Sequence, residues 1–125
     1  YALRKGYNVA VISGGYAESM KLRYQDFKGM EMYLKVTDKV EKLNEYLASH
    51  NLQKEHVLVV GDDIPDYKMM LLCGVKCCPA DASIEIKDIA DYISFQPAGS
   101  GCVRDVIEQT LRLQGKWFEE DACLW

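Results

Sequence analysis

Short apolar runs of strand length alternate with segments of helical periodicity along most of this chain. A run of four to eight apolar residues that ends at glycine or polar residues is typical of a strand buried on both faces. Strands are therefore expected over 8–15 (NVAVISGG), 30–36 (MEMYLKV), 56–60 (HVLVV), 75–78 (VKCC) and, at the periphery, 92–95 (YISF). Strands that alternate with helices form a mostly parallel sheet, because right-handed crossovers place the helices on its faces. The pattern predicts an α/β fold, a three-layer sandwich around a Rossmann-like sheet.

Helices are expected in the segments between these runs. Large apolar and aromatic residues recur at helical spacing within 16–27 and predict an amphipathic helix over 17–27. The next helix follows Thr37 or Asp38, either of which can cap it, and buries Val40, Leu43 and Leu47. Further helices are expected over 66–73 with Gly74 at its end, over 83–91 with Ser83 as its cap, and over 101–114 with Val103, Ile107 and Leu111 on one face.

Length and charge limit the classes of protein to consider. The chain has 125 residues, of which 49% are hydrophobic and 27% charged, so it can build one domain with a real core. We expect that domain over 1–117, followed by a tail over 118–125. The net charge of -4 and scattered basic residues argue against a general nucleic-acid binder. Because no apolar run approaches the roughly 20 residues of a membrane helix, we expect a soluble, cytoplasmic protein with no membrane partner.

The cysteines also favour a cytosolic compartment. They are Cys73, Cys77, Cys78, Cys102 and Cys123, an odd number without the Cys-x-x-Cys spacing of zinc or redox sites. Adjacent cysteines rarely meet the geometry of a disulfide. We therefore expect reduced core residues rather than disulfides or metal ligands.

Polar residues gather where three of the expected strands end. In parallel α/β sheets, ligands bind beyond the carboxyl ends of the strands, so these residues are expected to face one crevice. They are Ser13 with Gly14 and Gly15, Thr37 with Asp38 and Lys39, and Asp62 with Asp63 and Asp66. A hydroxyl, an ammonium group and a cluster of carboxylates would meet there.

Each group also has a purely structural interpretation. Ser13 with its glycines can form a helix cap or a tight turn, and the Gly-x-Gly-x-x-Gly pattern of dinucleotide sites is absent. Lys39 can be a solvated surface residue, although a lysine at a helix start opposes the helix dipole. One aspartate can cap the helix after Pro65, but this accounts for one carboxylate of three.

A divalent cation explains the crowded aspartates better. Adjacent carboxylates in a partly buried crevice cost stability, and a bound cation removes that cost. Magnesium takes oxygen ligands and typically uses one or two carboxylates together with waters and phosphate oxygens. A lysine and a hydroxyl across the crevice would then hold the phosphate. The combination predicts a magnesium and phosphate site.

The order of these motifs resembles the haloacid dehalogenase superfamily of phosphatases. "VAVISGG" is similar to its second motif, Lys39 in "VTDK" to its third, and "VVGDDIPD" to its fourth. More narrowly, "GDDIPDYKMM", "CCPADASIEIKDIADYIS" and "GSGCVRDVIEQTLRLQGKW" resemble the small, capless phosphatases that act on 3-deoxy-D-manno-octulosonate 8-phosphate. The resemblance covers residues 1–117, and it implies hydrolysis of this sugar phosphate or a related one in lipopolysaccharide biosynthesis.

The resemblance also implies roles for individual residues. The metal site would comprise Asp62 as a direct magnesium ligand, Asp63 acting through water and Asp66 orienting the cluster. Ser13, Gly14 and Lys39 would hold the phosphoryl group, with Ser13 and Lys39 contributing to catalysis. The family is typically a homotetramer whose neighbouring subunits share the sugar site, and Arg104 with "PAGSG" matches the segment that forms it. Gly15 departs from relatives that carry a charged residue there.

One family motif does not occur in this sequence. The first motif, Asp-x-Asp-Gly, carries the nucleophile and the acid/base, on a central strand between those that end at Ser13 and Gly61. "YALRKG" resembles the tail of a longer helix, so we expect a domain that lacks this strand at its N-terminus and is catalytically incomplete. An enzyme fragment and a non-catalytic binding or assembly domain of the same fold both remain open. A receiver-like signalling domain is a more remote alternative, because the motif order is wrong for it.

Overall fold

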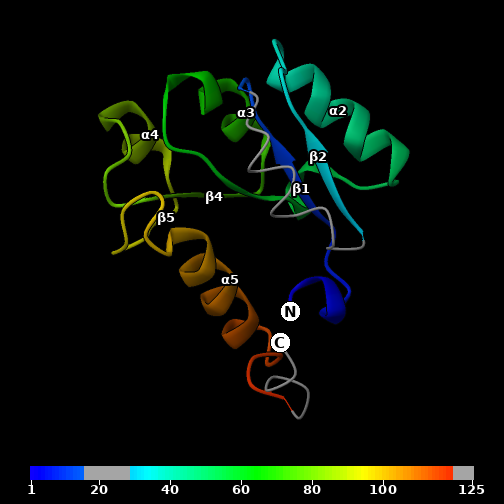
Figure 1. The fold of residues 1–125 in the computed structure, drawn as a ribbon, viewed down its shortest axis with the longest axis vertical. Helices are drawn as coiled ribbons and strands as arrows, with labels where there is room; N and C mark the ends of the chain where they lie inside the picture. The colour runs from blue at the N-terminus through cyan, green and yellow to red at the C-terminus, as the bar shows by residue number, and fades with distance from the viewer. Residues whose placement is uncertain (16–28, 120–125) are drawn as a thin grey trace.

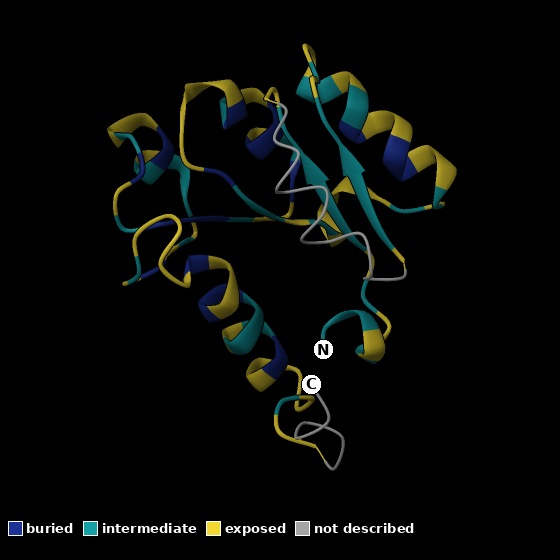
Figure 2. Ribbon diagram, viewed as in Figure 1, coloured by how far each residue is buried: buried dark blue, intermediate teal, exposed yellow. Residues whose placement is uncertain are grey.

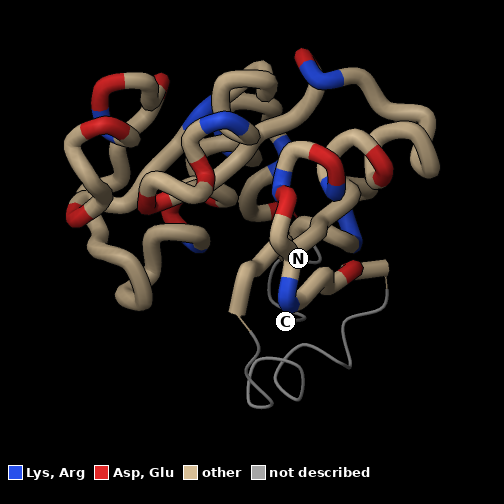
Figure 3. The backbone as a smooth tube through the Cα atoms, turned by 90° about the horizontal axis from the view of Figure 1, so that it is seen from above, with Lys and Arg blue, Asp and Glu red and all other residues tan. Residues whose placement is uncertain are grey.

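The structure is a computed structural model that describes residues 1–15 and 29–119. The helix expected over 17–27, Cys123 and most of the expected tail lie outside these described residues. Among the helices that the structure describes, none is both long enough and apolar enough to cross a lipid bilayer. Lysine, arginine and acidic residues are spread along the described chain rather than gathered by sign (Figure 3).

The described strands form two parallel sheets (Figure 1). In the first, β1 (Val9–Ile12) pairs with β2 (Met30–Tyr33). In the second, β4 (Val75–Cys78) lies between β3 (Leu58–Val60) and the short β5 (Tyr92–Ile93). The predicted parallel α/β fold is confirmed. Within the described residues β1 and β3 do not pair with each other. The expectation that a central strand is lacking between them stays a prediction.

Helices lie on both sides of these sheets. On one side are α2 (Lys39–Ser49), α3 (Tyr67–Leu72) and α4 (Ile84–Ile89), whereas α5 (Cys102–Leu113) lies on the other (Figure 1). Single 3-10 turns occur at η1 (Leu3–Lys5), η2 (Lys54–His56) and η3 (Ile64–Asp66). The expected strand over 56–60 is shorter than predicted because its first residue belongs to η2. The expected helix over 66–73 is preceded by η3.

Helix capping decides where α2 begins. The Asp38 carboxylate accepts a hydrogen bond of 3.0 Å from the amide of Glu41, so Asp38 rather than Thr37 is the cap. Ser83 stands at the predicted cap position of α4, but its side chain makes no capping hydrogen bond, and its Oγ is buried without a partner in the described residues. The position was predicted correctly and the interaction was not.

The core lies between the sheets and the helices that cover them (Figure 2). One buried cluster joins α2 to α3 through Leu43, Tyr46, Leu47, Met69 and Cys73. A second cluster joins α3 to α4 through Met70, Cys78, Ala82 and Ile86. The buried stripe predicted for α2 is confirmed at Leu43 and Leu47, and Val40 packs against it.

The face predicted for α5 was partly wrong. Val103 is 57% exposed, whereas Cys102, Val106 and Leu111 are buried. The helix is rotated from the expected face because Asp105 is turned inward, where it accepts hydrogen bonds of 2.7 Å from both Tyr92 and Ser94. A buried carboxylate needs such partners, so these bonds fix which side of α5 meets β5.

The described cysteines are free and buried, as predicted. Burial raises the pKa of Cys77 to about 11, and it also raises the pKa of Cys73, Cys78 and Cys102. A thiol reacts as its thiolate, so these residues are inert packing groups at neutral pH.

Candidate active site

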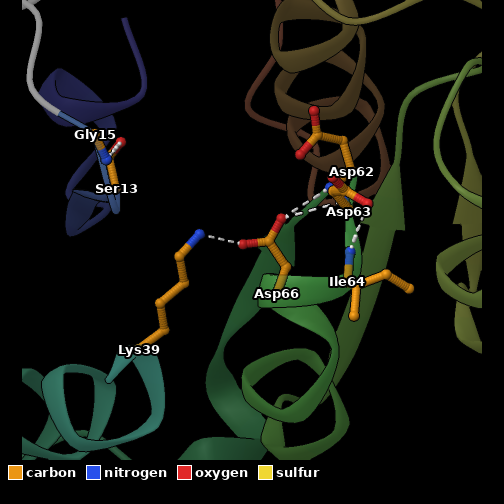
Figure 4. A network of polar contacts seen from close by, with 7 residues as sticks. All are labelled: Ser13, Gly15, Lys39, Asp62, Asp63, Ile64 and Asp66. Atoms are coloured by element: carbon orange, nitrogen blue, oxygen red, sulfur yellow. Dashed lines mark hydrogen bonds and ion pairs between the residues drawn. The ribbon is translucent and has the colours of Figure 1, made fainter. Parts of the chain in front are cut away.

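The turn after β3 is organised by Asp66. The carboxylate of Asp66 is buried, and its Oδ2 accepts hydrogen bonds from the amides of Asp62 at 3.1 Å and Asp63 at 3.4 Å (Figure 4). Asp63 Oδ1 accepts a bond of 2.8 Å from the amide of Ile64. Asp63 and Asp66 also form a reciprocal capping box around η3, in which each side chain accepts from the backbone amide of the other. Asp66 therefore fixes the backbone that carries the other two aspartates.

The second oxygen of Asp66 binds the lysine at the start of α2. Lys39 Nζ lies 2.5 Å from Asp66 Oδ1, and the two side chains are only 17% and 10% exposed (Figure 4). Burial raises the pKa of Asp66, but the hydrogen bonds from Lys39 and from the two amides outweigh burial and hold the pKa below its usual value. Lys39 is thus a positioned cation and not a solvated surface residue.

Gly61 permits this arrangement by having no side chain. A Cβ at this position would lie 2.8 Å from the Cβ of Asp66 and 2.5 Å from the Sδ of Met70. The close approach explains why glycine precedes the paired aspartates of "GDD" in this chain.

Asp62 lies in an electronegative position. Partial burial raises the pKa of Asp62, and the neighbouring charges of Asp66 and Asp63 raise it further. Over the described ranges, no group of three or more His, Cys, Asp or Glu side chains is gathered closely enough to hold a metal ion. This agrees with Asp66 using its oxygens for Lys39 and for backbone amides, and it leaves Asp62 and Asp63 as the carboxylates that remain for a cation.

The turn after β1 adopts the local structure that serine and glycine favour. Ser13 Oγ accepts a hydrogen bond of 3.2 Å from the amide of Gly15. The Ser13 amide donates to Tyr33 at 2.9 Å, and the Ser13 carbonyl accepts from Val36 at 2.9 Å. These bonds hold Ser13 against the segment that leads to Lys39, and Figure 4 places Ser13 on the side of Lys39 away from Asp66.

The structure therefore brings together the three predicted groups by different means. Lys39 and Asp66 are in direct contact, while Ser13 with Gly14 is joined to the Lys39 segment through the backbone of 33–36. Arg104 is exposed in the first turn of α5, which follows β5, a strand that is two places from β3 in the sheet. Its expected role in a shared subunit site stays a prediction.

Sequence reasoning missed the direct bond between Lys39 and Asp66. The Asp-x-x-Asp spacing across Pro65 was the available signal, because a helix-start capping box turns its second carboxylate back toward the strand end.

A parallel α/β domain with a lysine–aspartate pair and further carboxylates at the carboxyl ends of its strands has the layout of a phosphoryl-transfer domain. The family model for haloacid dehalogenase-like hydrolases matches residues 16–105. The chain belongs to this family.

Among individual relatives, the chain is similar to 3-deoxy-D-manno-octulosonate 8-phosphate phosphatase KdsC of Salmonella typhi. The two are 30% identical over 118 residues, which is 94% of this chain and 63% of the relative. The solved structure of the Yersinia pestis phosphatase of the same name has a TM-score of 0.87 at 30% identity and covers 91% of this chain and 62% of that one.

A more distant structure supports the fold alone. The Moraxella catarrhalis phosphatase, solved in complex with magnesium, phosphate and KDO, has a TM-score of 0.87 at 23% identity and covers 92% of this chain and 66% of that one. This chain spans about three-fifths of the length of the curated relatives that it matches, such as the Salmonella typhi phosphatase.

Proposed function

We propose that this chain forms the phosphate and metal part of a magnesium-dependent phosphatase. Its substrate is 3-deoxy-D-manno-octulosonate 8-phosphate or a related keto-sugar-acid phosphate, which water converts to the free sugar acid and inorganic phosphate. The observation that carries this proposal is the buried bond between Lys39 and Asp66 at the carboxyl edge of the strands. The named substrate of the relatives at 30% identity supports the choice of sugar.

Lys39 would bind the phosphoryl group with its ammonium. Phosphoryl transfer needs charge neutralisation and alignment, and a lysine supplies the first only if it is held in place. Asp66 holds it at 2.5 Å, and the Ser13 turn is held by the bond that Ser13 donates to the Tyr33 carbonyl and the bond that it accepts from the Val36 amide. Ser13 and Gly14 would then donate to the phosphate oxygens from the opposite side.

The residues present fit a magnesium ion. Asp62 and Asp63 are exposed carboxylates on a backbone that Asp66 keeps rigid, and magnesium commonly uses only one or two carboxylates. When bound, the ion would supply positive charge to the transferring phosphoryl group. Both oxygens of Asp66 already accept hydrogen bonds, so we assign Asp66 the positioning of Lys39 and of this backbone, in place of direct ligation.

The nucleophile is not supplied by the printed sequence, which contains no Asp-x-Asp-Gly. Within the described residues, β1 and β3 each pair with a strand on one edge only, and a strand carrying this motif would add at their other edges in the parallel direction of every described pairing. The chain as printed is therefore proposed to bind phosphate and metal without turnover.

A chimera tests this function. A strand ending in Asp-x-Asp-Gly, followed by a crossover helix, is joined ahead of Tyr1, and phosphate release from 3-deoxy-D-manno-octulosonate 8-phosphate is measured with and without magnesium. We expect release that requires magnesium and falls at least about 100-fold in the Lys39→Met chimera, since loss of one positioned charge costs roughly 3 kcal/mol of transition-state stabilisation. Lys54→Met, which changes an exposed lysine of η2, is the matched control.

One outcome would reject the enzyme proposal, and another would reject the role of Lys39. A folded chimera that binds the sugar phosphate without releasing phosphate would favour the second candidate, a non-catalytic binding domain, which the missing motif makes reasonable. Equal phosphate release by wild-type and Lys39→Met chimeras would remove Lys39 from the site.

Assembly as a homotetramer in the cytoplasm belongs to the same proposal, and sedimentation of the chimera tests the tetramer.

A further inference from the structure

The loop between β4 and α4, residues 79–83, contacts the turn that carries the proposed magnesium ligands. The amide of Ser83 donates a hydrogen bond of 3.0 Å to the carbonyl of Asp62. This bond joins two loops that follow different strands, since Asp62 comes after β3 and Ser83 comes after β4. The backbone of Asp62 is therefore held from the start of α4 as well as from within its own turn.

Asp62 differs from Asp63 in how its backbone is held. The amide of Asp63 donates to the Asp66 carboxylate at 3.4 Å, and the carbonyl of Asp63 accepts from the Asp66 amide at 2.9 Å. The amide of Asp62 also donates to Asp66, at 3.1 Å, but its carbonyl accepts from Ser83. Asp66 thus anchors Asp63 on both sides, whereas the position of Asp62 depends on two separate elements of the fold.

The 79–83 loop is itself anchored, so it can serve as a fixed support. Ala82 is buried in the cluster that joins α4 to α3. The carboxylate of Asp81 accepts a hydrogen bond of 2.8 Å from the amide of Ala98. The amide of Ala80 donates to the carbonyl of Gln96 at 2.9 Å. The loop is therefore held by the core on one side and by the segment before α5 on the other.

The contribution of Ser83 to this contact comes from its amide and not from its side chain. Its Oγ makes no capping bond to α4 and is buried without a partner in the part of the chain that the structure describes. The backbone of Ser83 has a φ of -60°. Since a proline ring fixes φ near about -65°, Ser83→Pro keeps this conformation and removes the N–H that reaches Asp62.

We propose that Ser83 is a positioning residue for the metal site, and that its amide holds the Asp62 backbone where the carboxylate can bind magnesium. Magnesium demands near-ideal ligand geometry, so a small displacement of a ligand weakens its binding. Loss of a group that orients a metal ligand typically lowers metal affinity by roughly 10- to 100-fold. The inference rests on the proposed function, because it takes Asp62 as a magnesium ligand.

Calorimetric titration of the 125-residue chain with magnesium chloride tests this role by comparing Ser83→Pro with Ser83→Ala. Both variants lose the buried hydroxyl, but alanine keeps the amide. Ser83→Pro should bind magnesium about tenfold more weakly than wild type, and Ser83→Ala should bind it as tightly as wild type. Val106→Ala shortens a buried side chain of α5, so it should lower the free energy of unfolding and leave magnesium affinity unchanged.

Asp81→Ala decides the question if Ser83→Pro does not fold. This variant keeps the Ser83 amide but releases the 79–83 loop from Ala98. Magnesium should then bind about threefold more weakly, which corresponds to the loss of roughly one net hydrogen bond from the support of Asp62.

Other results overturn the assignment. Equal magnesium affinity of Ser83→Pro and Ser83→Ala would reject it, as would equal affinity of Asp81→Ala and wild type where Ser83→Pro does not fold. A loss in Val106→Ala as large as that in Ser83→Pro would mean that affinity follows global stability. No magnesium binding by wild type would reject the positioning role together with the metal site.

Failure of this inference can be told apart from failure of the proposed function. Magnesium affinity that depends on the Ser83 amide, beside a chimera that releases no phosphate, would reject the proposed hydrolysis and leave the role of Ser83 standing. A chimera that releases phosphate, beside magnesium affinity that does not depend on the Ser83 amide, would reject the role of Ser83 and leave the hydrolysis standing.

Discussion

Lys39 and Asp66 are 27 residues apart in the sequence and are joined by a bond of 2.5 Å between Nζ and Oδ1. The pair connects the start of α2 to the turn after β3, and the same carboxylate fixes the amides of Asp62 and Asp63. One buried side chain thereby holds both the proposed phosphate-binding cation and the backbone of the proposed metal site.

Asp66→Asn should destabilise the fold. The change removes the charge that binds Lys39 while an amide oxygen can still accept from the backbone, so the loss should be about 1.5–3 kcal/mol. Urea unfolding measures the free energy of unfolding. Glu55→Gln changes an exposed carboxylate of η2 and serves as the control. A loss no larger than that of the control would mean that the pair contributes nothing to stability.

Lys39→Met should weaken binding of inorganic phosphate at least about tenfold, because a charge-assisted bond is lost. It should also lower stability, since Asp66 is left as a buried carboxylate without its cation. Titration of phosphate in the presence of magnesium measures the first effect. Lys42 lies one turn further along α2 and pairs with Glu45 in place of Asp66. The Lys42→Met variant should therefore bind phosphate as tightly as wild type. Equal weakening by both variants would show a general charge effect.

Asp105 should make stability sensitive to acid. Burial raises its pKa, but hydrogen bonds from Tyr92, Ser94 and Gln109 outweigh burial and hold the pKa below its usual value. A lowered folded-state pKa gives stability that is present above the unfolded value of about 3.9 and is lost as the pH falls through the folded value. In urea unfolding from about pH 6 to about pH 3, Asp105→Asn should be less stable at the upper end and should lose less on acidification. An identical pH dependence to wild type would contradict this.

Native cysteines should resist labelling. Burial raises the pKa of Cys77 to about 11, and Cys73, Cys78 and Cys102 are also buried. Iodoacetamide at neutral pH should therefore modify these four only after unfolding in urea, as peptide mass spectrometry would show. Rapid modification of Cys77 in the folded chain would mean that the β4 region is open.

Much of the fold could be predicted from local sequence. The β4 run "VKCC" was predicted at the residues where it occurs, and Asp38 was one of the two residues considered as the cap of α2, because burial and capping are decided by neighbours in the chain. Val103 was placed on the wrong face because the inward side of α5 is set by Asp105 bonding to β5, a tertiary contact that periodicity does not report.

The positions of the candidate site residues could be predicted from the sequence, but the contacts between their side chains could not, because those contacts are tertiary. The strand-end positions of Lys39, Asp62 and Asp66 follow from a parallel sheet. The contacts that each of these side chains makes do not follow from the sheet, since they depend on the direction in which each carboxylate points. The capping box directs Asp66 toward Lys39 and leaves Asp62 outside that pair.

Magnesium binding tests the proposed site most directly. The melting temperature of the 125-residue chain is measured by circular dichroism with and without magnesium. The measurement compares wild type, Asp62→Asn and the control Glu55→Gln. A cation that binds only the folded chain stabilises it by mass action. Magnesium should raise the melting temperature of wild type and of Glu55→Gln, and the increase should vanish in Asp62→Asn. An increase of the same size in Asp62→Asn, or none in wild type, would contradict a metal site at the end of β3.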